Sequence, residues 1–302
     1  MSQLRNLQIQ SVLYHNEKSR IIRSIKSIVR AVDFSIHERI FDKVVVQYGD
    51  GSPAPIFTDE DLECLKKEYG EFIELKYEFF GENLGSARGH NRLASLSSTN
   101  FIMIINPDIL LAPDTILELA KPFWESKNNI GIVEAKQLPI EHPKWFDPKS
   151  GATSWASTAC VLMPRKAFDS VDGFDADTFF LYCDDVDFSW MLRKEGFQVL
   201  FQPSAVAFHD KTLSDEASWR TSSAEDYFSA EAGLLLAYKW SRIDILQNIL
   251  AYFEQSDVDY YIKAAAEFRR REAAGILPKQ YDTNHKIGEF SNNNYGKMRF
   301  VL

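Results

Sequence analysis

The chain has 302 residues, of which 45% are hydrophobic and 25% are charged, and its formal net charge is −9. This balance is typical of a globular protein, and the length allows one α/β domain with an appendage. The negative charge opposes nucleic-acid binding, which needs a positive surface to displace counterions. A small phosphorylated substrate remains compatible, because a bound cation can meet its charge locally.

The sequence also predicts a cellular compartment. Residues 1–14 lack the apolar stretch and cleavage site of a secretory signal, and no segment reaches the ~18 apolar residues of a membrane-spanning helix. Cys64, Cys160 and Cys183 are far apart and have neither disulfide-framework nor zinc-site spacing. We expect a cytoplasmic protein, with peripheral association at the inner face of the cell membrane left open.

Residues 1–210 alternate between short apolar runs and helical patterns, which predicts βαβ units around a largely parallel sheet. The expected strands cover residues 9–14, 44–47, 72–80, 101–105, 130–135, 159–163, 197–201 and 206–208. The expected helices cover 17–31, 59–69, the end of the glycine-rich loop to 96, 113–124 and 188–194. Residues 138–155 are expected to form a long surface loop, and loops of this length often carry function.

From residue 211 to residue 302 the pattern changes to consecutive helices, expected at 224–240, 243–253 and 258–274, with a tail from about residue 282. Their apolar side chains are Leu234, Leu235, Leu236, Ile243, Leu246, Ile249 and Leu250. Helices that are apolar on one side need a partner surface. We therefore expect a helical C-terminal extension that packs on the core and frames the acceptor side, or that contacts a second subunit in a homo-oligomer.

Acidic residues follow three of the predicted strands. Asp50 follows the second strand, Asp108 follows the fourth, and a cluster of Asp184, Asp185 and Asp187 lies further along the chain. Open α/β sheets bind their ligands at the carboxyl ends of strands. Carboxylates gathered there form a metal site or an acid–base pair, and a divalent cation with oxygen ligands suits a diphosphate. Taken alone, each Asp is more typical of a turn or a helix cap.

Several motifs together resemble one known family. They are YHNE at residues 14–17, NLGSARGHN at 83–91, IINPDILLAPD from residue 104, MPRKAF, and DGFDADTFFLYCDDVDFSWMLRKEGF. The chain is similar over about residues 8–210 to the family-2 inverting glycosyltransferases with the GT-A fold, and within them to bacterial rhamnosyltransferase-like members. The resemblance implies a Rossmann-like mixed sheet, the nucleotide-diphospho-sugar transferase fold, in residues 1–210.

The resemblance also implies catalytic and metal-binding roles. Asp108 would coordinate Mg²⁺ or Mn²⁺ bridging a diphosphate, and Asn106 stands where the family often has a first Asp. His209 occupies the place of a metal-binding His, although a lone His after a strand is more often a packed imidazole. Asp185 matches the general base that deprotonates the acceptor hydroxyl. Asp184 replaces the usual Glu and would orient the acceptor.

The remaining expected contacts concern the donor and the acceptor. Asp50 would bind the base or ribose with a one-residue shift from the family pattern, and Asn83 begins the glycine-rich donor loop. Arg88 would contact the diphosphate or ribose, and a solvated helix position is the equally weighted alternative. Trp155 would be a stacking platform for the acceptor, with ordinary packing as its alternative.

The expected activity is inverting transfer of a sugar from dTDP-L-rhamnose or a UDP-sugar to a hydroxyl of a growing bacterial glycan, free or lipid-linked. A nucleotidyltransferase is the rival enzyme, but no glycine-rich basic loop follows the first strand. A dehydrogenase is disfavoured because no GxGxxG follows that strand. The non-enzymatic alternative is a nucleotide-sugar-binding subunit without turnover.

Overall fold

The computed structural model describes residues 6–125, 128–139, 142–210, 223–291 and 294–298. Its centre is a mixed sheet with the strand order β3-β2-β1-β4-β7-β6-β8-β5. The strands are β1 (Asn6–Leu13), β2 (Lys43–Asp50), β3 (Glu74–Phe79), β4 (Phe101–Ile105), β5 (Ile109–Leu111), β6 (Ile130–Leu138), β7 (Cys160–Pro164) and β8 (Gln198–His209). The α/β fold class predicted from the motifs is therefore confirmed.

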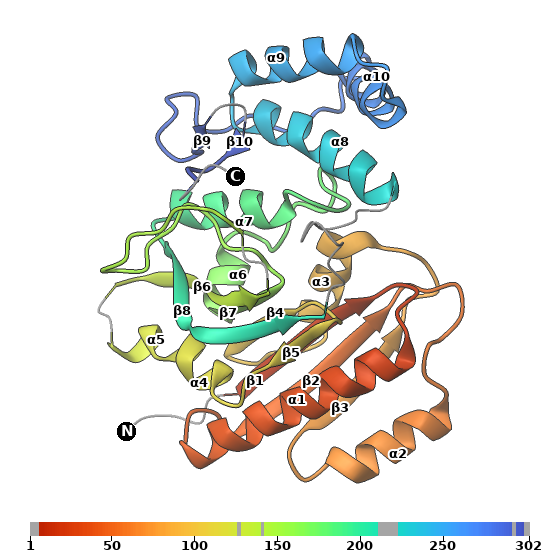
Figure 1. Ribbon diagram of the computed structural model, residues 1–302, viewed down its shortest axis with the longest axis vertical. Helices are drawn as coiled ribbons and strands as arrows, with labels where there is room; N and C mark the ends of the chain where they lie inside the picture. Colours follow the sequence, from red (N-terminus) through yellow and green to blue (C-terminus); the bar gives the residue numbers. More distant parts are fainter. Residues whose placement is uncertain (1–5, 126–127, 140–141, 211–222, 292–293, 299–302) are drawn as a thin grey trace.

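Ten helices are described around and above this sheet (Figure 1). They are α1 (Lys18–His37), α2 (Asp59–Tyr69), α3 (Gly85–Ser95), α4 (Thr115–Ala120), α5 (Pro122–Glu125), α6 (Arg165–Ser170), α7 (Asp184–Lys194), α8 (Ser223–Lys239), α9 (Ile243–Glu254) and α10 (Asp259–Ala273). One apolar cluster joins the sheet to α1, α2 and α4, and another joins it to α3, α6 and α7. The sheet is thus covered on both faces.

The sheet is largely parallel, as expected: six of its eight described strands run in one direction, and only β7 and β5 run against them. Strands β3, β2, β1 and β4 run parallel, and β6 pairs parallel with β8. Strand β7 is antiparallel to both β4 and β6, and β5 is antiparallel to β8. The two strands expected at 197–201 and 206–208 are one strand, β8, whose register against β6 shifts between Ala135 and Lys136. Near-continuous apolar runs are typical of parallel strands, but they did not identify β7 and β5 as the two reversed strands.

Several helix boundaries also differ from the expectation. The helix expected to end at residue 31 continues to His37, and the one expected at 113–124 is divided at Lys121 into α4 and α5. Helix α7 begins at Asp184 instead of residue 188, so the acidic cluster lies in its first turn. By contrast, α2 covers residues 59–69 as expected, because Thr58 and Asp61 form a capping box that fixes its start.

The C-terminal helices form a second layer of packing above α7, visible in Figure 1. Helices α8, α9 and α10 share one apolar cluster with α7, in which Val186 and Trp190 of α7 contact the neighbourhood of Leu234 and Trp240. A buried ion pair reinforces this junction. The Nζ atom of Lys239 on α8 lies 2.8 Å from Asp187 Oδ2 and 2.6 Å from Asp175 Oδ2.

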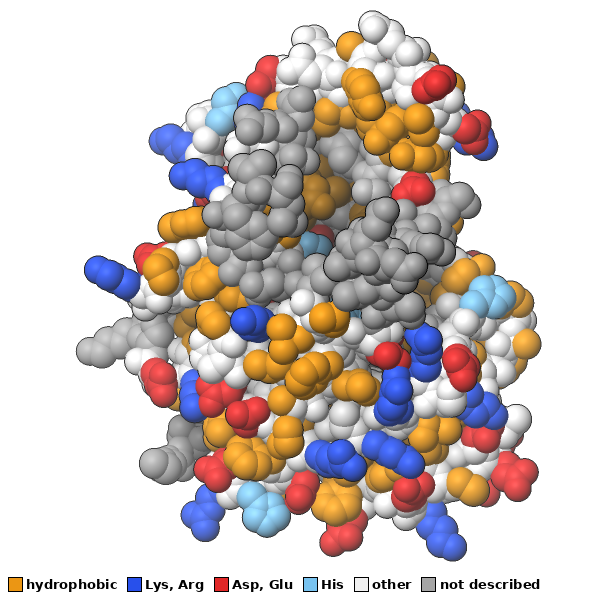
Figure 2. Space-filling view, viewed as in Figure 1, with side chains coloured by type: hydrophobic (Ala, Val, Ile, Leu, Met, Phe, Trp, Pro, Cys, Tyr) orange, Lys and Arg blue, Asp and Glu red, His pale blue; other side chains and the backbone are white. Residues whose placement is uncertain are grey.

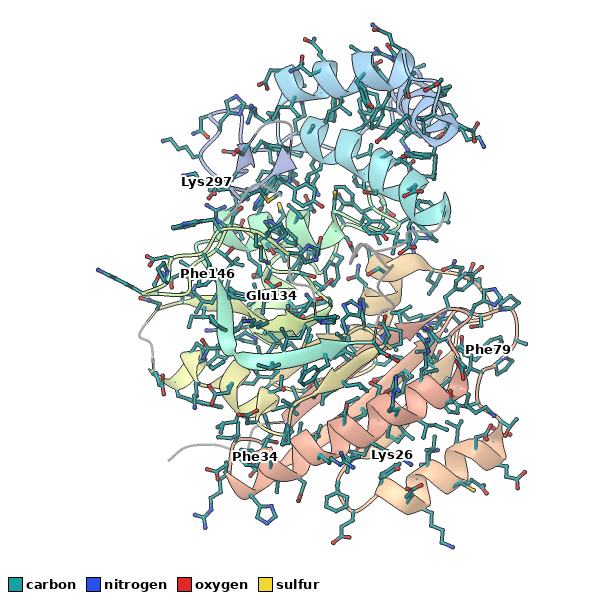
Figure 3. The ribbon with its side chains drawn as sticks, viewed as in Figure 1. Lys26, Phe34, Phe79, Glu134, Phe146 and Lys297 are labelled. Carbon is teal, nitrogen blue, oxygen red and sulfur yellow. The ribbon has the colours of Figure 1, made fainter. Side chains whose placement is uncertain are left out.

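The segment after residue 282 is not a tail. It forms a hairpin of β9 (Phe290–Ser291) and β10 (Asn294–Tyr295), and Phe290 packs against Trp190. Its end returns to the 138–155 loop, where the Trp145 N–H donates to the carbonyl of Lys297 at 2.7 Å. Figure 3 labels Lys297 close to Phe146 of that loop. Aromatic side chains, not periodic aliphatic ones, anchor the hairpin, which is why helical periodicity does not reveal it.

Replacement of Lys239 by Met is expected to destabilise the protein by about 3–5 kcal/mol, because Asp187 is left buried without its cation. Urea unfolding monitored by circular dichroism measures the loss. The matched control is Lys263→Met, which breaks an exposed pair with Asp259 and should change stability by less than about 1 kcal/mol. Equal stabilities of the two variants would contradict the proposed anchor.

Candidate functional site

The carboxyl ends of several strands meet at one edge of the sheet. Strands β1 and β2 end side by side at Leu13 and Asp50. Strand β4 ends just before Asn106, and the pairing of β5 with β8 sets Ile109 opposite His209. Residues far apart in the sequence are thus brought to one edge, as expected for an α/β ligand site.

Asp108 and His209 lie in direct contact at this edge. The His209 Nε2 atom is 3.1 Å from Asp108 Oδ1, and the imidazole is buried. Its Nδ1 atom is 3.1 Å from Gln137 Oε1, and the Gln137 amide nitrogen donates to Ser157 Oγ. Because Gln137 Oε1 can only accept a hydrogen bond, His209 Nδ1 donates to it and carries a proton. This hydrogen bond orients the imidazole so that Nε2 faces Asp108.

This pair fits a divalent cation in part. A carboxylate oxygen and an imidazole nitrogen are both metal ligands, and the hydrogen bond from Nδ1 orients the ring as in known metal sites. Among the described residues no group of three His, Cys, Asp or Glu side chains is placed to hold a metal. A Mg²⁺ or Mn²⁺ ion here would therefore need further ligands from phosphate oxygens and water, which is how Mg²⁺ sites at substrate phosphates are built. Gln137 was not predicted from the sequence.

The second group of carboxylates begins helix α7. Tyr182 and Cys183 precede it with φ angles of +68° and +54°, a left-handed conformation that is rare outside glycine. Such strained backbone clusters at functional sites. It precedes the first turn of α7, in which Asp184 is buried and Asp185 is partly buried. Asp184 is 5% exposed, and its Oδ2 atom has no hydrogen-bond partner among the described residues.

Burial governs the charge of both carboxyls. Desolvation raises the pKa of Asp184 to about 6, against a hydrogen bond from Ser86 that lowers it. Desolvation also raises the pKa of Asp185 to about 7, and the nearby charge of Asp184 adds to the rise. The ammonium of Lys144 acts in the opposite direction and lowers the pKa of Asp185. A carboxyl with a pKa near neutrality is suited to accept a proton at physiological pH.

Sequence reasoning missed a buried ion pair beside these carboxyls. The Lys144 ammonium bonds the Glu134 carboxylate, and both side chains are at most 5% exposed. Figure 3 labels Glu134 in the interior, on β6 below α7. Lys144 also lies over the ring of Trp155, 4.0 Å from its centroid. A signal did exist in the sequence, because Glu134 interrupts the apolar run of a buried strand, and charged residues are seldom fully buried without a partner.

Asp187, the third acid of α7, points away from this group. It accepts a hydrogen bond from Trp240 Nε1 at 2.9 Å and pairs with Lys239. Successive helical residues turn by about 100°, so a residue two positions on faces the opposite side. Asp187 therefore joins α7 to α8, and only Asp184 and Asp185 remain for chemistry.

The predicted donor contacts occupy the rim of the site. Both carboxylate oxygens of Asp50 accept internal hydrogen bonds, from the N–H groups of Ser52 and Ile56 and from the Tyr77 hydroxyl. Asp50 is fully buried and thus shapes the loop after β2. Asn83 accepts a hydrogen bond from the Gly85 N–H at the start of α3.

Arg88 and Asn106 complete the predicted donor residues. Arg88 is exposed on α3, where it pairs with Asp177 at 3.2 Å. The Asn106 N–H donates to the carbonyl of Ala159, and its own carbonyl accepts from the Ile109 N–H. These bonds form the turn that carries Asp108 to the sheet edge.

Trp155 does not offer a free face, which corrects the expectation of an open stacking platform. Its side chain is 4% exposed, and Lys144 lies over the ring. The rings of His142 and Tyr295 approach it edge-on, with centroids 5.3 and 5.4 Å away. Trp155 instead lines a pocket together with other aromatic residues, among them Tyr295. A Trp in a predicted loop looks exposed in the sequence, but here the C-terminal hairpin covers it.

No protein-family model matches the sequence. The N-acetylglucosaminyl-diphospho-decaprenol L-rhamnosyltransferases of two Mycobacterium tuberculosis strains are 27% identical to this chain. The alignment covers 44% of this chain and 58% of each relative, so the chain spans less than two thirds of the curated relatives it matches.

Solved glycosyltransferases share the fold. The mannosyltransferase PcManGT from Pyrobaculum calidifontis, in complex with GDP-Man and Mn²⁺, has a TM-score of 0.54 at 17% identity and covers 92% of this chain and 78% of its own. GalNAc-T7 with UDP, GalNAc and Mn²⁺ has a TM-score of 0.62 at 12% identity, covering 96% and 59%. Residues 1–349 of S. aureus TarS with UDP-GlcNAc give 0.53 at 14% identity, covering 89% and 73%.

These likenesses establish that the chain has the GT-A fold of the nucleotide-sugar glycosyltransferases. Within that class the chain is rhamnosyltransferase-like, because the curated relatives that it resembles in sequence are L-rhamnosyltransferases. Both statements agree with the motifs on which the resemblance was based. No helix among the described residues is long and apolar enough to cross a membrane.

The raised pKa values predict a pH-dependent stability. A carboxyl whose pKa rises on folding contributes its full stability below the unfolded pKa near 4, and this contribution is lost as the pH rises through about 7. Asp185→Asn should therefore stabilise metal-free protein by about 1–4 kcal/mol at pH 8 and by much less at pH 5. Urea unfolding at the two pH values measures this. Asp177→Asn, at a side chain 97% exposed, is the control and should show no such pH-dependent gain.

Proposed function

We propose that this protein is an inverting glycosyltransferase that moves a sugar from a nucleotide-diphosphate donor to an acceptor hydroxyl. The observation that carries the proposal is Asp185, a carboxyl with a pKa of about 7 at the start of α7 in a GT-A fold. The contact between Asp108 and His209 at the sheet edge supports it. The general activity within this proposal, sugar transfer from a nucleotide sugar, is supported by the names of the relatives and by the shared fold.

The reaction follows from these residues. Asp185 takes the proton of the acceptor hydroxyl as its oxygen attacks the anomeric carbon. The new C–O bond forms on the face opposite the breaking bond to the diphosphate, so the configuration inverts and the nucleoside diphosphate leaves. Asp184 orients the acceptor, or it holds the proton that the two neighbouring carboxyls, Asp184 and Asp185, share. Mg²⁺ or Mn²⁺ held by Asp108 and His209 would offset the charge of the leaving diphosphate when bound.

The rim residues would then bind the donor. Asp50 holds the loop after β2 that would receive the base or ribose. Asn83 and Arg88 lie at the start of α3, whose N-terminal N–H groups favour anions. Asn106 forms the turn that carries Asp108. In this proposal residues 1–210 form the donor-binding and catalytic domain, and residues 211–302 form the helical extension.

The donor we propose is dTDP-L-rhamnose, with a UDP-sugar as the alternative. The named relatives are L-rhamnosyltransferases whose printed acceptor is N-acetylglucosaminyl-diphospho-decaprenol. By analogy the acceptor here is a growing bacterial glycan, free or lipid-linked. We further propose that the protein is cytoplasmic and that a lipid-linked acceptor would bring it to the inner face of the membrane as a peripheral protein.

Metal dependence is expected to follow the pair at the sheet edge. Asp108→Ala should abolish Mn²⁺-dependent turnover, and His209→Ala should weaken Mn²⁺ affinity by about 10–100-fold while leaving the fold intact. Titration of Mn²⁺ into EDTA-treated protein, followed by nucleoside diphosphate release, measures both effects. Asp114→Ala, at an exposed acid a few residues further on, is the control. Full activity in EDTA would contradict the metal assignment.

Asp185→Asn tests the function itself. The amide keeps the shape but cannot accept a proton, so sugar-dependent release of nucleoside diphosphate should fall by about two to four orders of magnitude. Donor affinity, measured by calorimetry, should stay within a few-fold, because the donor is held elsewhere. In the wild type, kcat/KM should fall below about pH 7 as the carboxyl is protonated.

Two outcomes would contradict this proposal. Wild-type protein that binds nucleotide sugars but never releases the nucleoside diphosphate would be a binding subunit without turnover. Asp185→Asn protein that keeps more than about a tenth of wild-type turnover would remove the base from the mechanism. Asp187→Asn gives no matched control, because that residue anchors α8.

A further inference from the structure

A pocket of about 500 Å³ lies between the catalytic core and the helical extension. One wall comes from α8, α9 and α10, and the other from the 138–155 loop and the C-terminal hairpin. Figure 2 shows the surface hollowed beside these helices, with hydrophobic side chains around the recess. The volume is within the range of small-molecule sites, about 300–1,000 Å³.

The pocket is lined by aromatic rings that also carry polar groups. Tyr252, Phe253 and Tyr261 form one aromatic group, in which Phe253 and Tyr261 stack with centroids 4.3 Å apart. Trp155 and Tyr295 stand on the other wall. Tyr252 is 61% exposed, an unusual state for a large aromatic residue beside a pocket. The side chains of Asn248, Ser229 and Asp226 add hydrogen-bonding groups to the lining.

The pocket adjoins the proposed base. Two lining residues, Lys144 and Tyr295, are electrostatically coupled to Asp185: the Lys144 ammonium stabilises the Asp185 carboxylate, and that carboxylate contributes to raising the pKa of Tyr295, which burial raises most. Trp155 and Tyr295 of the lining also pack in one apolar cluster with Cys183 and Val186, the residues on either side of Asp184 and Asp185. The pocket therefore lies beside the turn that carries the proposed base.

Gly233 keeps part of this pocket open. It lies within α8, lines the pocket, and a Cβ atom built on it would meet nothing within 4 Å. Glycine inside a helix weakens the helix relative to Ala or Leu. Within the described part of the chain no packing contact explains the glycine, because no neighbour lies where a side chain would extend. Because Gly233 has no side chain, this part of the pocket stays open to a ligand.

We propose that this pocket is the acceptor subsite and that it binds a neutral pyranose ring. The inference rests on the proposed function and names the substrate class of its acceptor side. Aromatic faces pack on the C–H faces of a sugar, while tyrosine hydroxyls, an amide and a carboxylate bind its hydroxyl groups. Among the described lining residues, the one Lys or Arg side chain is Lys144, and it is paired with Glu134, which disfavours a phosphate as the ligand. The polar groups among the rings disfavour a purely apolar chain.

The sharpest test fills the pocket without disturbing the fold. Gly233→Leu adds a side chain where no atom stands within 4 Å, at a position where Leu favours the helix. Its melting temperature should equal or exceed that of the wild type. Gly233→Ala, which gives the same helical benefit with only a methyl group, is the matched control.

The probes are the methyl glycosides of glucose, galactose, mannose, rhamnose and N-acetylglucosamine, observed by saturation-transfer NMR on the full chain. At least one glycoside should bind the wild type and Gly233→Ala, and Gly233→Leu should weaken that binding at least tenfold. Tyr252→Ala should also weaken it, whereas Ile243→Ala, an exposed residue on the same helix outside the pocket, should not.

The outcomes separate this inference from the proposed function. Binding of no glycoside by the wild type, or undiminished binding by folded Gly233→Leu, would overturn the acceptor subsite even if nucleotide sugars are turned over. Binding of decyl phosphate that Gly233→Leu removes, with no glycoside bound, would make the pocket a lipid site and overturn it too. Wild-type protein that binds a glycoside but never releases nucleoside diphosphate would instead contradict the proposed function.

Discussion

The arrangement at the start of α7 is the constraint on which the site and the packing both depend. Three carboxylates lie there within four residues, Asp184 and Asp187 buried and Asp185 partly buried, and helical geometry sends them in different directions. Asp187 faces α8 and is neutralised by Lys239, which ties the extension to the core. Among the described residues, no salt bridge is formed by Asp184 or Asp185, and desolvation raises their pKa values toward neutrality. One short helix therefore supplies both an anchor and a candidate base.

The mixed sheet provides the second half of the site. Because β5 runs antiparallel to β8, residues 100 positions apart in the chain are paired, and Asp108 and His209 meet just beyond β4. Gln137 on neighbouring β6 then orients the imidazole. Two neighbouring parallel strands need a long crossover connection between them. Here β8, which follows α7 in the chain, instead pairs antiparallel with β5, and this pairing places His209 beside Asp108.

The helical extension is part of the same structural unit as α7. Its helices bury Trp190 and Val186, and its terminal hairpin covers Trp155, so the candidate base lies beneath residues from both halves of the chain. The division of the chain at residue 210 describes the change of pattern in the sequence, but the apolar packing continues across it. This shared core also explains why a pocket forms between the two halves.

The sequence by itself determined the local elements and the residue types of the site. Helix 59–69 and strand 101–105 follow from capping and from an apolar run, and the motifs around Asp108 and Asp185 indicated the GT-A fold. The tertiary structure alone decided the direction of β7, the hairpin after residue 282 and the Glu134–Lys144 pair. It also decided that Trp155 is buried. The reason is physical: capping and periodicity act between near neighbours, whereas strand direction, burial and pKa depend on partners distant in the chain.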